Sequence, residues 1–304
     1  MSDKWDEAVE IFSLGAEMSL NYHDEPIQVC YSGGKDSDVL LEVAKCSEQP
    51  FVLVYNITTV DSPDTLRHIN EVFRREEQNG IKCLRVVPTY QGKPINMWDL
   101  IVKKTLPPLR TARYCCEVLK EHATEQHVVA TGVRWAESVQ RSNRQPIEVI
   151  ASKMKDRVGY DPTVKQMSFT MDNTAEHKIA EYCSMGRKTA VNPIIKFSDR
   201  DIWNIIYDCH IKVNPMYDKG YDRVGCVGCP MASLEDRTRE FKDYPHIKEK
   251  YIKAFDRLVE TYPHTRNWKN GQECFDWWLK LPPPDQFRME LDDQEQGDKK
   301  NDDV

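Results

Sequence analysis

The stretch "CYSGGKDSDVLLEV" (Cys30–Val43) decides the fold, because two glycines in it join an apolar run to an amphipathic run. Ile27–Tyr31 predicts a short buried strand, and the apolar residues after Asp36 recur with helical spacing. Glycine lets a ligand approach the backbone, and the first N–H groups of a helix lack partners and carry partial positive charge. The turn therefore predicts an anion site, to which Lys35 adds a full charge. An ordinary strand–helix turn that happens to contain a lysine is the simpler alternative.

The motif in this turn differs from the best known phosphate loop. The pattern G-x-x-x-x-G-K-[ST] is missing here, which argues against a kinase or a GTPase. The stretch instead resembles the pyrophosphate loop (PP-loop), S-G-G-x-D-S, of the adenine nucleotide alpha-hydrolase superfamily. Members of that superfamily act at the alpha phosphate; some split ATP into AMP and pyrophosphate, and others bind a sulfonucleotide. The nucleotide-binding residues that the resemblance implies in this loop are Ser32, Gly33, Gly34, Lys35, Asp36 and Ser37.

Strand and helix patterns alternate along the first half of the chain. Apolar runs at 51–55, 81–87 and 128–130 alternate with helical patterns at 5–23 and 64–79. This spacing predicts an α/β fold with a doubly wound, mostly parallel sheet and helices on both faces. Ligands of such sheets bind beyond the carboxyl ends of the strands. We therefore add four residues at those ends to the predicted nucleotide site, namely Asp61, Ser62, Gly132 and Arg134.

Composition changes divide the chain into segments. We expect an N-terminal helix (1–24), a nucleotide-binding domain (25–235) with an insertion at about 146–190, a helical C-terminal lobe (236–288) and a disordered acidic tail (289–304). Within the domain, Ser198 is expected to cap a helix.

Bulk properties restrict the class of protein. The 304 residues carry a net charge of −7, which argues against a broadly basic nucleic-acid surface. No apolar run approaches the ~20 residues of a membrane span. The N-terminal stretch is acidic and lacks the apolar core of a signal peptide. These features predict a cytoplasmic protein with no membrane partner.

Four of the ten cysteines form two pairs, Cys115 with Cys116 and Cys226 with Cys229. In a cytoplasmic chain such pairs indicate metal or redox chemistry rather than disulfides. Four thiolates suit a zinc ion or a cubane iron–sulfur cluster. Adjacent cysteines close poorly on one ion, whereas a cubane offers separate iron corners, so the pattern favours [4Fe–4S]. Two unrelated pairs, one of them a zinc half-site, and a thioredoxin-like redox pair are the alternatives.

The combination of motifs is more specific than any one of them. The PP-loop, the Cys-Cys pair and the distal G-C-x-x-C together resemble the phosphoadenylyl/adenylyl sulfate (PAPS/APS) reductase family, over roughly residues 26–235. The stretches Asn192–Trp203 and Asn214–Pro230 also resemble that family. Thr131–Arg141 resembles its segment G-[IVL]-R-x-x-[EQ]-S-x-x-R, which carries phosphate and sulfate recognition. The matching positions are Gly132, Arg134, Glu137, Ser138 and Arg141.

One departure from the family concerns the nucleophile. The assimilatory reductases end in Glu-Cys-Gly-[IL]-His, whose cysteine attacks the sulfur of the sulfonucleotide, and this chain has no such segment. Cys274 is the only cysteine after the distal pair. Bulky neighbours, Trp277 and Trp278, favour a structural role for it.

The resemblance implies three hypotheses. In the first, which also draws on the DNA phosphorothioation member of the family, the protein transfers sulfur at the expense of ATP and releases pyrophosphate. Lys35, Asp36, Arg134 and Arg141 would be catalytic, with Mg²⁺ near Asp36 or Asp61. A cysteine desulfurase or thioredoxin-like donor and a nucleic-acid acceptor are the expected partners. In the second, the protein reduces APS or PAPS to sulfite. In the third, it is a non-catalytic nucleotide-binding subunit.

Overall fold

The computed structural model describes residues 3–121, 127–137, 141–149, 159–160, 188–263 and 268–280. Chain contacts divide the protein into two compact units. The first, which we call the sheet unit, comprises Met1–Asn56, Pro63–Val86 and Thr124–Gly225. The second, which we call the helical unit, comprises Ile57–Ser62, Val87–Ala123 and Cys226–Val304.

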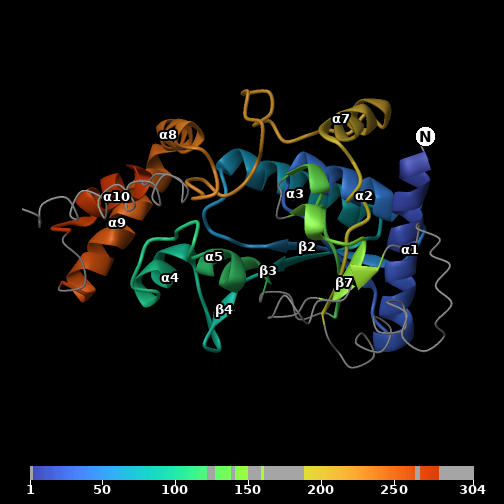
Figure 1. Ribbon diagram of the computed structural model, residues 1–304, viewed down its shortest axis with the longest axis horizontal. Helices are drawn as coiled ribbons and strands as arrows, with labels where there is room; N and C mark the ends of the chain where they lie inside the picture. The colour runs from blue at the N-terminus through green and yellow to red at the C-terminus, as the bar shows by residue number, and fades with distance from the viewer. Residues whose placement is uncertain are drawn as a thin grey trace, which may run out of the picture. The chain divides into compact units, whose positions relative to one another are not determined.

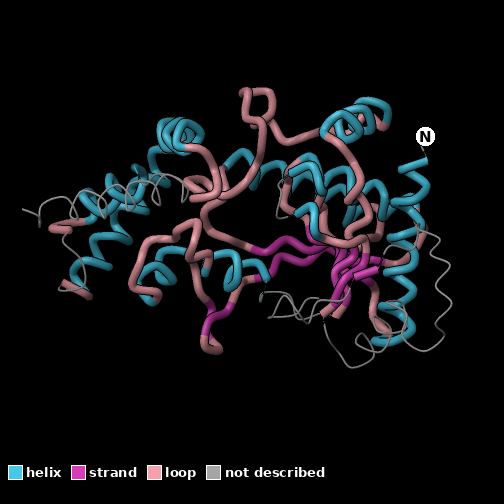
Figure 2. The backbone as a smooth tube through the Cα atoms, viewed as in Figure 1, coloured by secondary structure: helices cyan, strands magenta, loops and turns pink. Residues whose placement is uncertain are grey.

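The sheet unit contains the α/β core. Its helices are α1 (Asp3–His23), α2 (Lys35–Cys46), α3 (Pro63–Gln78) and α7 (Asp199–Asp208), with 3₁₀ turns η2 (Trp135–Glu137) and η3 (Arg141–Asn143). Its strands are β1 (Ile27–Cys30), β2 (Phe51–Asn56), β3 (Lys82–Val86), β6 (Val128–Ala130), β7 (Ile147–Val149), β8 (Gly159–Tyr160) and β9 (Thr189–Val191). Helices α1, α2 and α3 flank the sheet (Figure 1), whose strands lie together as one layer (Figure 2).

The sheet confirms the expected fold class. In the described part of the chain its strand order is β3-β2-β1-β6-β9-β7-β8, and β3, β2, β1, β6 and β9 run parallel. Strand β1 pairs with β2 on one side and with β6 on the other, so the strand order reverses next to β1. A crevice at such a reversal, beyond the carboxyl ends of the strands, is where ligands bind in open α/β sheets. The glycine turn that follows β1 lies at this point.

Apolar runs explain why the central strands form. Val29, Leu53 and Ala130 lie in register on neighbouring strands and are fully buried. A strand buried on both faces needs a continuous apolar run rather than alternation, which the sequence of β2 provides. Helix α1 packs closely on β9, because a Cβ on Gly15 would lie 2.6 Å from a methyl carbon of Val191.

The far edge of the sheet is antiparallel. Strand β7 pairs antiparallel with both β9 and β8. Strands β7 and β8 come from the segment 146–190, which the sequence assigns to an insertion. Most of that segment, like residues 281–304 with the expected acidic tail, lies outside the described residues.

The helical unit has its own aromatic core. Its elements are β4 (Thr89–Tyr90), β5 (Lys93–Pro94), α4 (Met97–Lys103), α5 (Tyr114–Cys116), the π-helical turn η1 (Glu117–Glu121), α8 (Leu234–Asp243), α9 (Pro245–Thr261) and α10 (Gly271–Lys280). The rings of Phe241, Tyr251, Phe255, Phe275 and Trp278 are buried against one another, with centroids 4.8–6.4 Å apart. None of the helices described in either unit is long and apolar enough to span a bilayer.

Candidate functional site

The PP-loop connects β1 to α2 through two glycines with different backbone conformations. Gly33 has a φ of +75°, in the left-handed region that favours glycine, and a Cβ there would lie 2.8 Å from Ile69 Cγ1. Gly34 is extended, with φ −100° and ψ 158°, and is the N-cap of α2. The Ser37 hydroxyl donates to the Gly34 carbonyl at 2.7 Å. These contacts hold the loop in a fixed shape.

Unused donors lie at the start of α2. The backbone N–H groups of Gly33 and Asp36 donate to no other residue in the described part of the chain. The Gly34 N–H group, by contrast, donates to the Ser37 hydroxyl at 3.2 Å. Free N–H groups at the positive end of a helix form a binding site for phosphate.

Lys35 and Arg134 bring two cations to this helix start. Lys35 is buried, and its Nζ lies 3.8 Å from both Asp36 Oδ2 and Asp199 Oδ1. Arg134 is also buried and pairs more tightly, with Nε 2.6 Å from Asp36 Oδ1 and Nη2 2.8 Å from Asp199 Oδ1. Arg134 Nη1 donates to the Phe197 carbonyl at 3.2 Å. The two cations therefore differ, because the guanidinium is bound on three sides whereas the ammonium is held only by long contacts.

Both oxygens of the Asp36 carboxylate already face cations. Burial raises the pKa of Asp36, although Arg134 and Lys35 oppose the shift. Its Oδ1 accepts from Arg134 and its Oδ2 faces Lys35. Magnesium prefers carboxylate oxygens that are free to ligate it, so these surroundings do not support the magnesium-binding role that the sequence suggests for Asp36.

The loop after β6 lies against the start of α2. A Cβ on Gly132 would lie 3.3 Å from the carbonyl carbon and oxygen of Asp36, so glycine permits this close approach. Glu137 accepts from the Arg134 N–H group at 3.0 Å and pairs with the Arg141 guanidinium. The structure thus brings Gly132 and Arg134 to the PP-loop, while Arg141 reaches it through Glu137. Ser138 lies outside the described residues.

Sequence reasoning missed several residues that hold the loop. The Tyr217 hydroxyl accepts from the Lys35 N–H group at 2.9 Å. Burial raises the pKa of Tyr217, so the phenol stays neutral. Asn214 donates to the Gly33 carbonyl at 2.9 Å, and Asp199 pairs with both cations. These residues lie in the stretches Asn192–Trp203 and Asn214–Pro230, which resemble the reductase family. No local pattern in those stretches indicates which side chains reach the loop.

A buried polar network brackets the loop. Tyr31 precedes it and Asp38 follows it, and the Tyr31 hydroxyl donates to Asp38 Oδ1 at 2.5 Å. His68 Nε2 lies 3.2 Å from the same oxygen and 3.1 Å from the Tyr31 oxygen. Burial and the neighbouring Asp38 raise the pKa of Tyr31 well above its usual value. The network ties both ends of the loop to α3.

The distal cysteine pair lies in a firmly held turn of the helical unit. The Cys229 N–H group donates to the Cys226 carbonyl at 3.2 Å, and Gly228 has a φ of +73°. The Val227 N–H group donates to the Val60 carbonyl at 2.9 Å, and the Gly228 N–H group donates to Glu240 at 2.7 Å. These bonds fix the backbone that carries both thiols.

All four paired cysteines belong to the helical unit and affect one another electrostatically. Cys116 hydrogen-bonds with Cys115, which raises the pKa of Cys115 and lowers that of Cys116. Cys226 and Cys229 also raise the pKa of Cys115. Burial raises the pKa of Cys226 to about 12, which Lys120 opposes.

The chemistry of this donor set fits a thiolate-bound iron–sulfur cluster. Lys120 has a raised pKa, chiefly because of Cys226, and Arg113 Nη2 lies 3.6 Å from Cys116 Sγ. Such cations stabilise thiolates, the form that binds metal. No three His, Cys, Asp or Glu side chains among the described residues are arranged around one metal-ion position. A cubane spreads its four thiolates over four irons, so it does not require convergence on a single point.

Asp61 and Ser62, which the sequence assigns to the nucleotide site, belong to the helical unit. Asp61 accepts from the Thr58 hydroxyl at 2.6 Å and forms an antiparallel bridge with Cys226. Ser62 is fully buried. The structure therefore places Asp61 beside the distal cysteine pair.

The parallel sheet, its reversal beside β1 and the glycine loop at that point are the features of a PP-loop fold. The chain belongs to the phosphoadenosine phosphosulfate reductase domain family, whose model matches residues 26–232. This result confirms the resemblance found in the sequence.

Comparison with known proteins gives distant relatives. The chain is 24% identical to an uncharacterized protein of Methanocaldococcus jannaschii, over 80% of this chain and 44% of that protein. It is 23% identical to an adenosine 5'-phosphosulfate reductase of Geobacillus kaustophilus, over 68% of this chain and 74% of the relative. The phosphoadenylyl-sulfate reductase of Candida auris, a solved structure, has a TM-score of 0.40 and 14% identity, covering 74% of this chain and 96% of that one. The chain spans about half the length of the uncharacterized relatives it matches.

Proposed function

We propose that the protein is an iron–sulfur enzyme that uses ATP to activate an acceptor for sulfur transfer. The observation that carries this proposal is the PP-loop, where free N–H groups of Gly33 and Asp36 meet the loosely held ammonium of Lys35. Backbone donors at a helix start and an ammonium with only long ion-pair contacts suit the β and γ phosphates of ATP.

The proposed reaction begins at the alpha phosphate. An oxygen of the acceptor attacks it, the bond to the β phosphate breaks, and pyrophosphate leaves with the bonding electrons. A donor at the sulfide level then displaces the adenylated oxygen, and AMP leaves with that oxygen. Lys35 and the loop N–H groups stabilise the charge that develops on pyrophosphate. Arg134 positions Asp36 and Asp199, and no step passes through Mg²⁺.

The four cysteines supply the cofactor site in this proposal. Cys115, Cys116, Cys226 and Cys229 would hold a [4Fe–4S] cluster, with Lys120 balancing the thiolate charge. When bound, such a cluster provides iron that can hold sulfur. We further propose a cysteine desulfurase or thioredoxin-like sulfur donor, whose persulfide sulfur a thiol such as cysteine reduces to sulfide with formation of a disulfide, and a nucleic-acid acceptor.

A second candidate is a sulfonucleotide reductase, which the 23% identity to an adenosine 5'-phosphosulfate reductase favours. That reaction needs a reactive thiol beyond the cluster ligands. Cys274 is fully buried, and burial raises its pKa to about 12. A thiol in this state is a poor nucleophile, which supports the first candidate over the second.

The two candidates differ in their products. We expect anaerobically purified protein to release pyrophosphate from ATP when nucleic acid, a cysteine desulfurase and cysteine are present. Replacing Lys35 with Met should abolish this release, whereas the surface variant Lys82→Met should not. Repeated turnover of APS or PAPS to sulfite in the presence of thioredoxin would establish the reductase instead. Nucleotide binding without either product would support a non-catalytic subunit.

The role of Cys274 gives an independent test. We expect Cys274→Ser to leave nucleotide-dependent activity nearly unchanged, because the thiol is buried and protonated. Intact-mass analysis after incubation with labelled APS or PAPS checks this prediction. A sulfite adduct that maps to Cys274 and is missing in the Ser variant would favour the reductase.

A further inference from the structure

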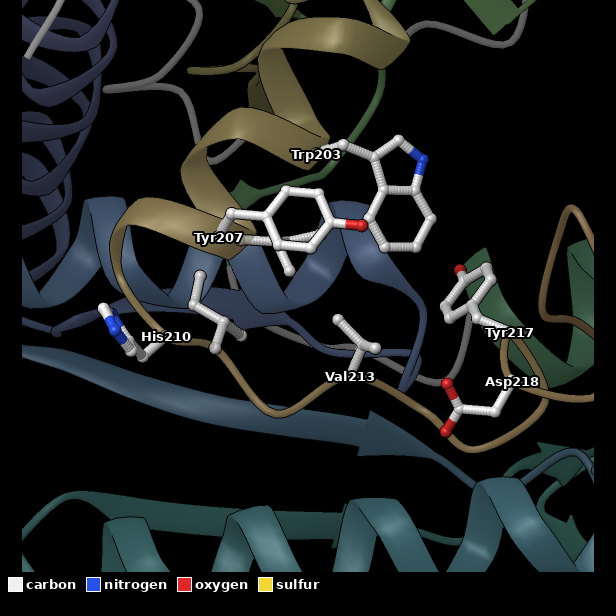
Figure 3. A pocket seen from close by; sticks show the side chains of 8 residues that line it. Trp203, Tyr207, His210, Val213, Tyr217 and Asp218 are labelled. Atoms are coloured by element: carbon white, nitrogen blue, oxygen red, sulfur yellow. The ribbon is translucent and has the colours of Figure 1, made fainter.

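A groove of about 500 Å³ lies in the sheet unit, between the C-terminal half of α7 and the segment that follows it. Its walls include Trp203, Tyr207, His210, Val213, Tyr217 and Asp218 (Figure 3). Cavities that bind small molecules have volumes of roughly 300–1,000 Å³. The groove therefore has room for a small ligand or for the end of a long side chain.

Three aromatic rings form the corner of this groove. Trp203 and Tyr217 have centroids 5.5 Å apart and planes at 84°, and Trp203 and Tyr207 are 6.2 Å apart at 32°. Trp203 and Tyr207 are four residues apart, which places them on one face of α7. Tyr207 is 71% exposed, so its ring is accessible to a ligand. The three rings line the groove (Figure 3).

The charge of the groove is set by an unpaired carboxylate. Asp218 is exposed, and it makes no hydrogen bond or ion pair with any other residue that the structure describes. Two nearby lysines are already engaged, Lys212 with Glu71 at 2.5 Å and Lys219 with Asp64 at 2.6 Å. Among the residues that the structure describes, no lysine or arginine lines the groove, although Lys35 Nζ lies 5.7 Å from the ring centroid of Tyr217. The groove therefore combines aromatic faces with a free negative charge.

We propose that this groove binds an organic cation of the alkylammonium class, with its charged head between the three rings and Asp218. Aromatic faces attract ammonium groups through their quadrupoles, and a carboxylate adds a direct charge. Asp218 repels phosphate-bearing ligands, which separates this groove from the PP-loop. The site is additional to the proposed ATP-dependent reaction, and it is testable without that reaction.

Calorimetric titration of the full chain with choline tests the proposal. The neutral isostere 3,3-dimethylbutan-1-ol has the same shape without the charge, and we expect it to bind about tenfold more weakly or worse. Asp218→Asn and Tyr207→Ala should each weaken choline binding roughly tenfold. Asp208→Asn is the matched control, because Asp208 is exposed on α7 but does not line the groove. Tyr207 and Asp218 are exposed, so both variants should fold, which circular dichroism checks.

Three results would overturn the proposal. Equal affinity for choline and its isostere would make the groove a purely apolar site. Tighter binding of adenosine than of choline, lost in Tyr207→Ala, would make it a base-stacking site. Undetectable choline binding to folded wild-type protein at millimolar concentration would remove the cation site altogether.

Discussion

Replacing each glycine of the PP-loop separately distinguishes a structural role from a ligand-binding role. At Gly34 the backbone is extended, and a Cβ would make ordinary contacts, 3.5 Å from the Tyr217 hydroxyl and 3.8 Å from Val224 Cβ. Valine favours extended backbone. At Gly33 the φ is +75°, and a Cβ would lie 2.8 Å from Ile69. Gly34→Val should therefore fold, whereas Gly33→Ala should be strained.

The two substitutions should affect different properties: Gly33→Ala should lower stability, and Gly34→Val should lower the affinity for ATP. For Gly33→Ala, the left-handed backbone and the overpacking against Ile69 together should lower the free energy of unfolding by about 2–5 kcal/mol. For Gly34→Val the loss should be smaller than for Gly33→Ala, because the backbone is extended and a Cβ there makes only ordinary contacts. Its methyl groups should instead keep phosphate from the loop N–H groups. Each lost hydrogen bond to a charged group costs about 1.5–3 kcal/mol, or roughly 10- to 150-fold in ATP affinity.

Urea denaturation and calorimetric titration with ATP, both on anaerobic protein, measure the two effects. The reasoning fails if Gly34→Val binds ATP within twofold of the wild-type affinity. It also fails if Gly33→Ala is as stable as the wild-type protein, since the loop would then adopt another backbone conformation.

Three further predictions concern charge and metal. Arg134→Met should lower the free energy of unfolding by about 1.5–3 kcal/mol in urea denaturation, because it removes a charged hydrogen-bonding partner of the half-buried Asp36 carboxylate, and adding Asp36→Asn should restore part of the loss. Hydrogen bonds from Lys4 and Ser198 lower the pKa of Asp201 to about 2. The ionised Asp201 therefore stabilises the folded protein above pH 4, and this stabilisation is lost as the pH falls toward 2. Asp201→Asn should flatten this part of the plot of unfolding free energy against pH. Anaerobically purified protein should contain about four irons per chain and absorb near ~400 nm. Cys115→Ala should lose this iron, whereas the control Cys83→Ala should keep it. Stoichiometric zinc in place of iron would contradict the cluster.

Local patterns were enough to predict the main elements of the fold. The strand before the PP-loop and the helix after it follow from short-range apolar spacing, and the expected cap of α7 is confirmed by the Ser198 hydroxyl, which accepts from the Asp201 N–H group at 3.2 Å. A parallel sheet follows from the alternation of such elements. These features depend on residues close together in the sequence.

The contacts that complete the loop could not be predicted in the same way. Tyr217 lies 182 residues from Lys35 along the chain, and Asp199 lies 65 residues from Arg134. Nothing in the local sequence distinguishes these two side chains from other polar residues, because their role depends on how the chain returns to the helix start. The helical unit could not be predicted from local patterns for the same reason, because it combines three separate stretches of the chain.

If the PP-loop binds phosphate as we propose, the charges around it explain how it accepts an anion although it contains Asp36 and lies beside Asp199. Two cations, Lys35 and Arg134, face Asp36 and Asp199, so their charges balance before a ligand binds. Arg134 is fixed by contacts of 2.6 and 2.8 Å, and releasing it would leave its own buried guanidinium unpaired. Lys35 is held only at 3.8 Å from each carboxylate, so turning its ammonium toward a phosphate loses little. We therefore propose that Lys35 binds phosphate and that Arg134 positions the carboxylates, because only the ammonium can change partners while the network stays intact.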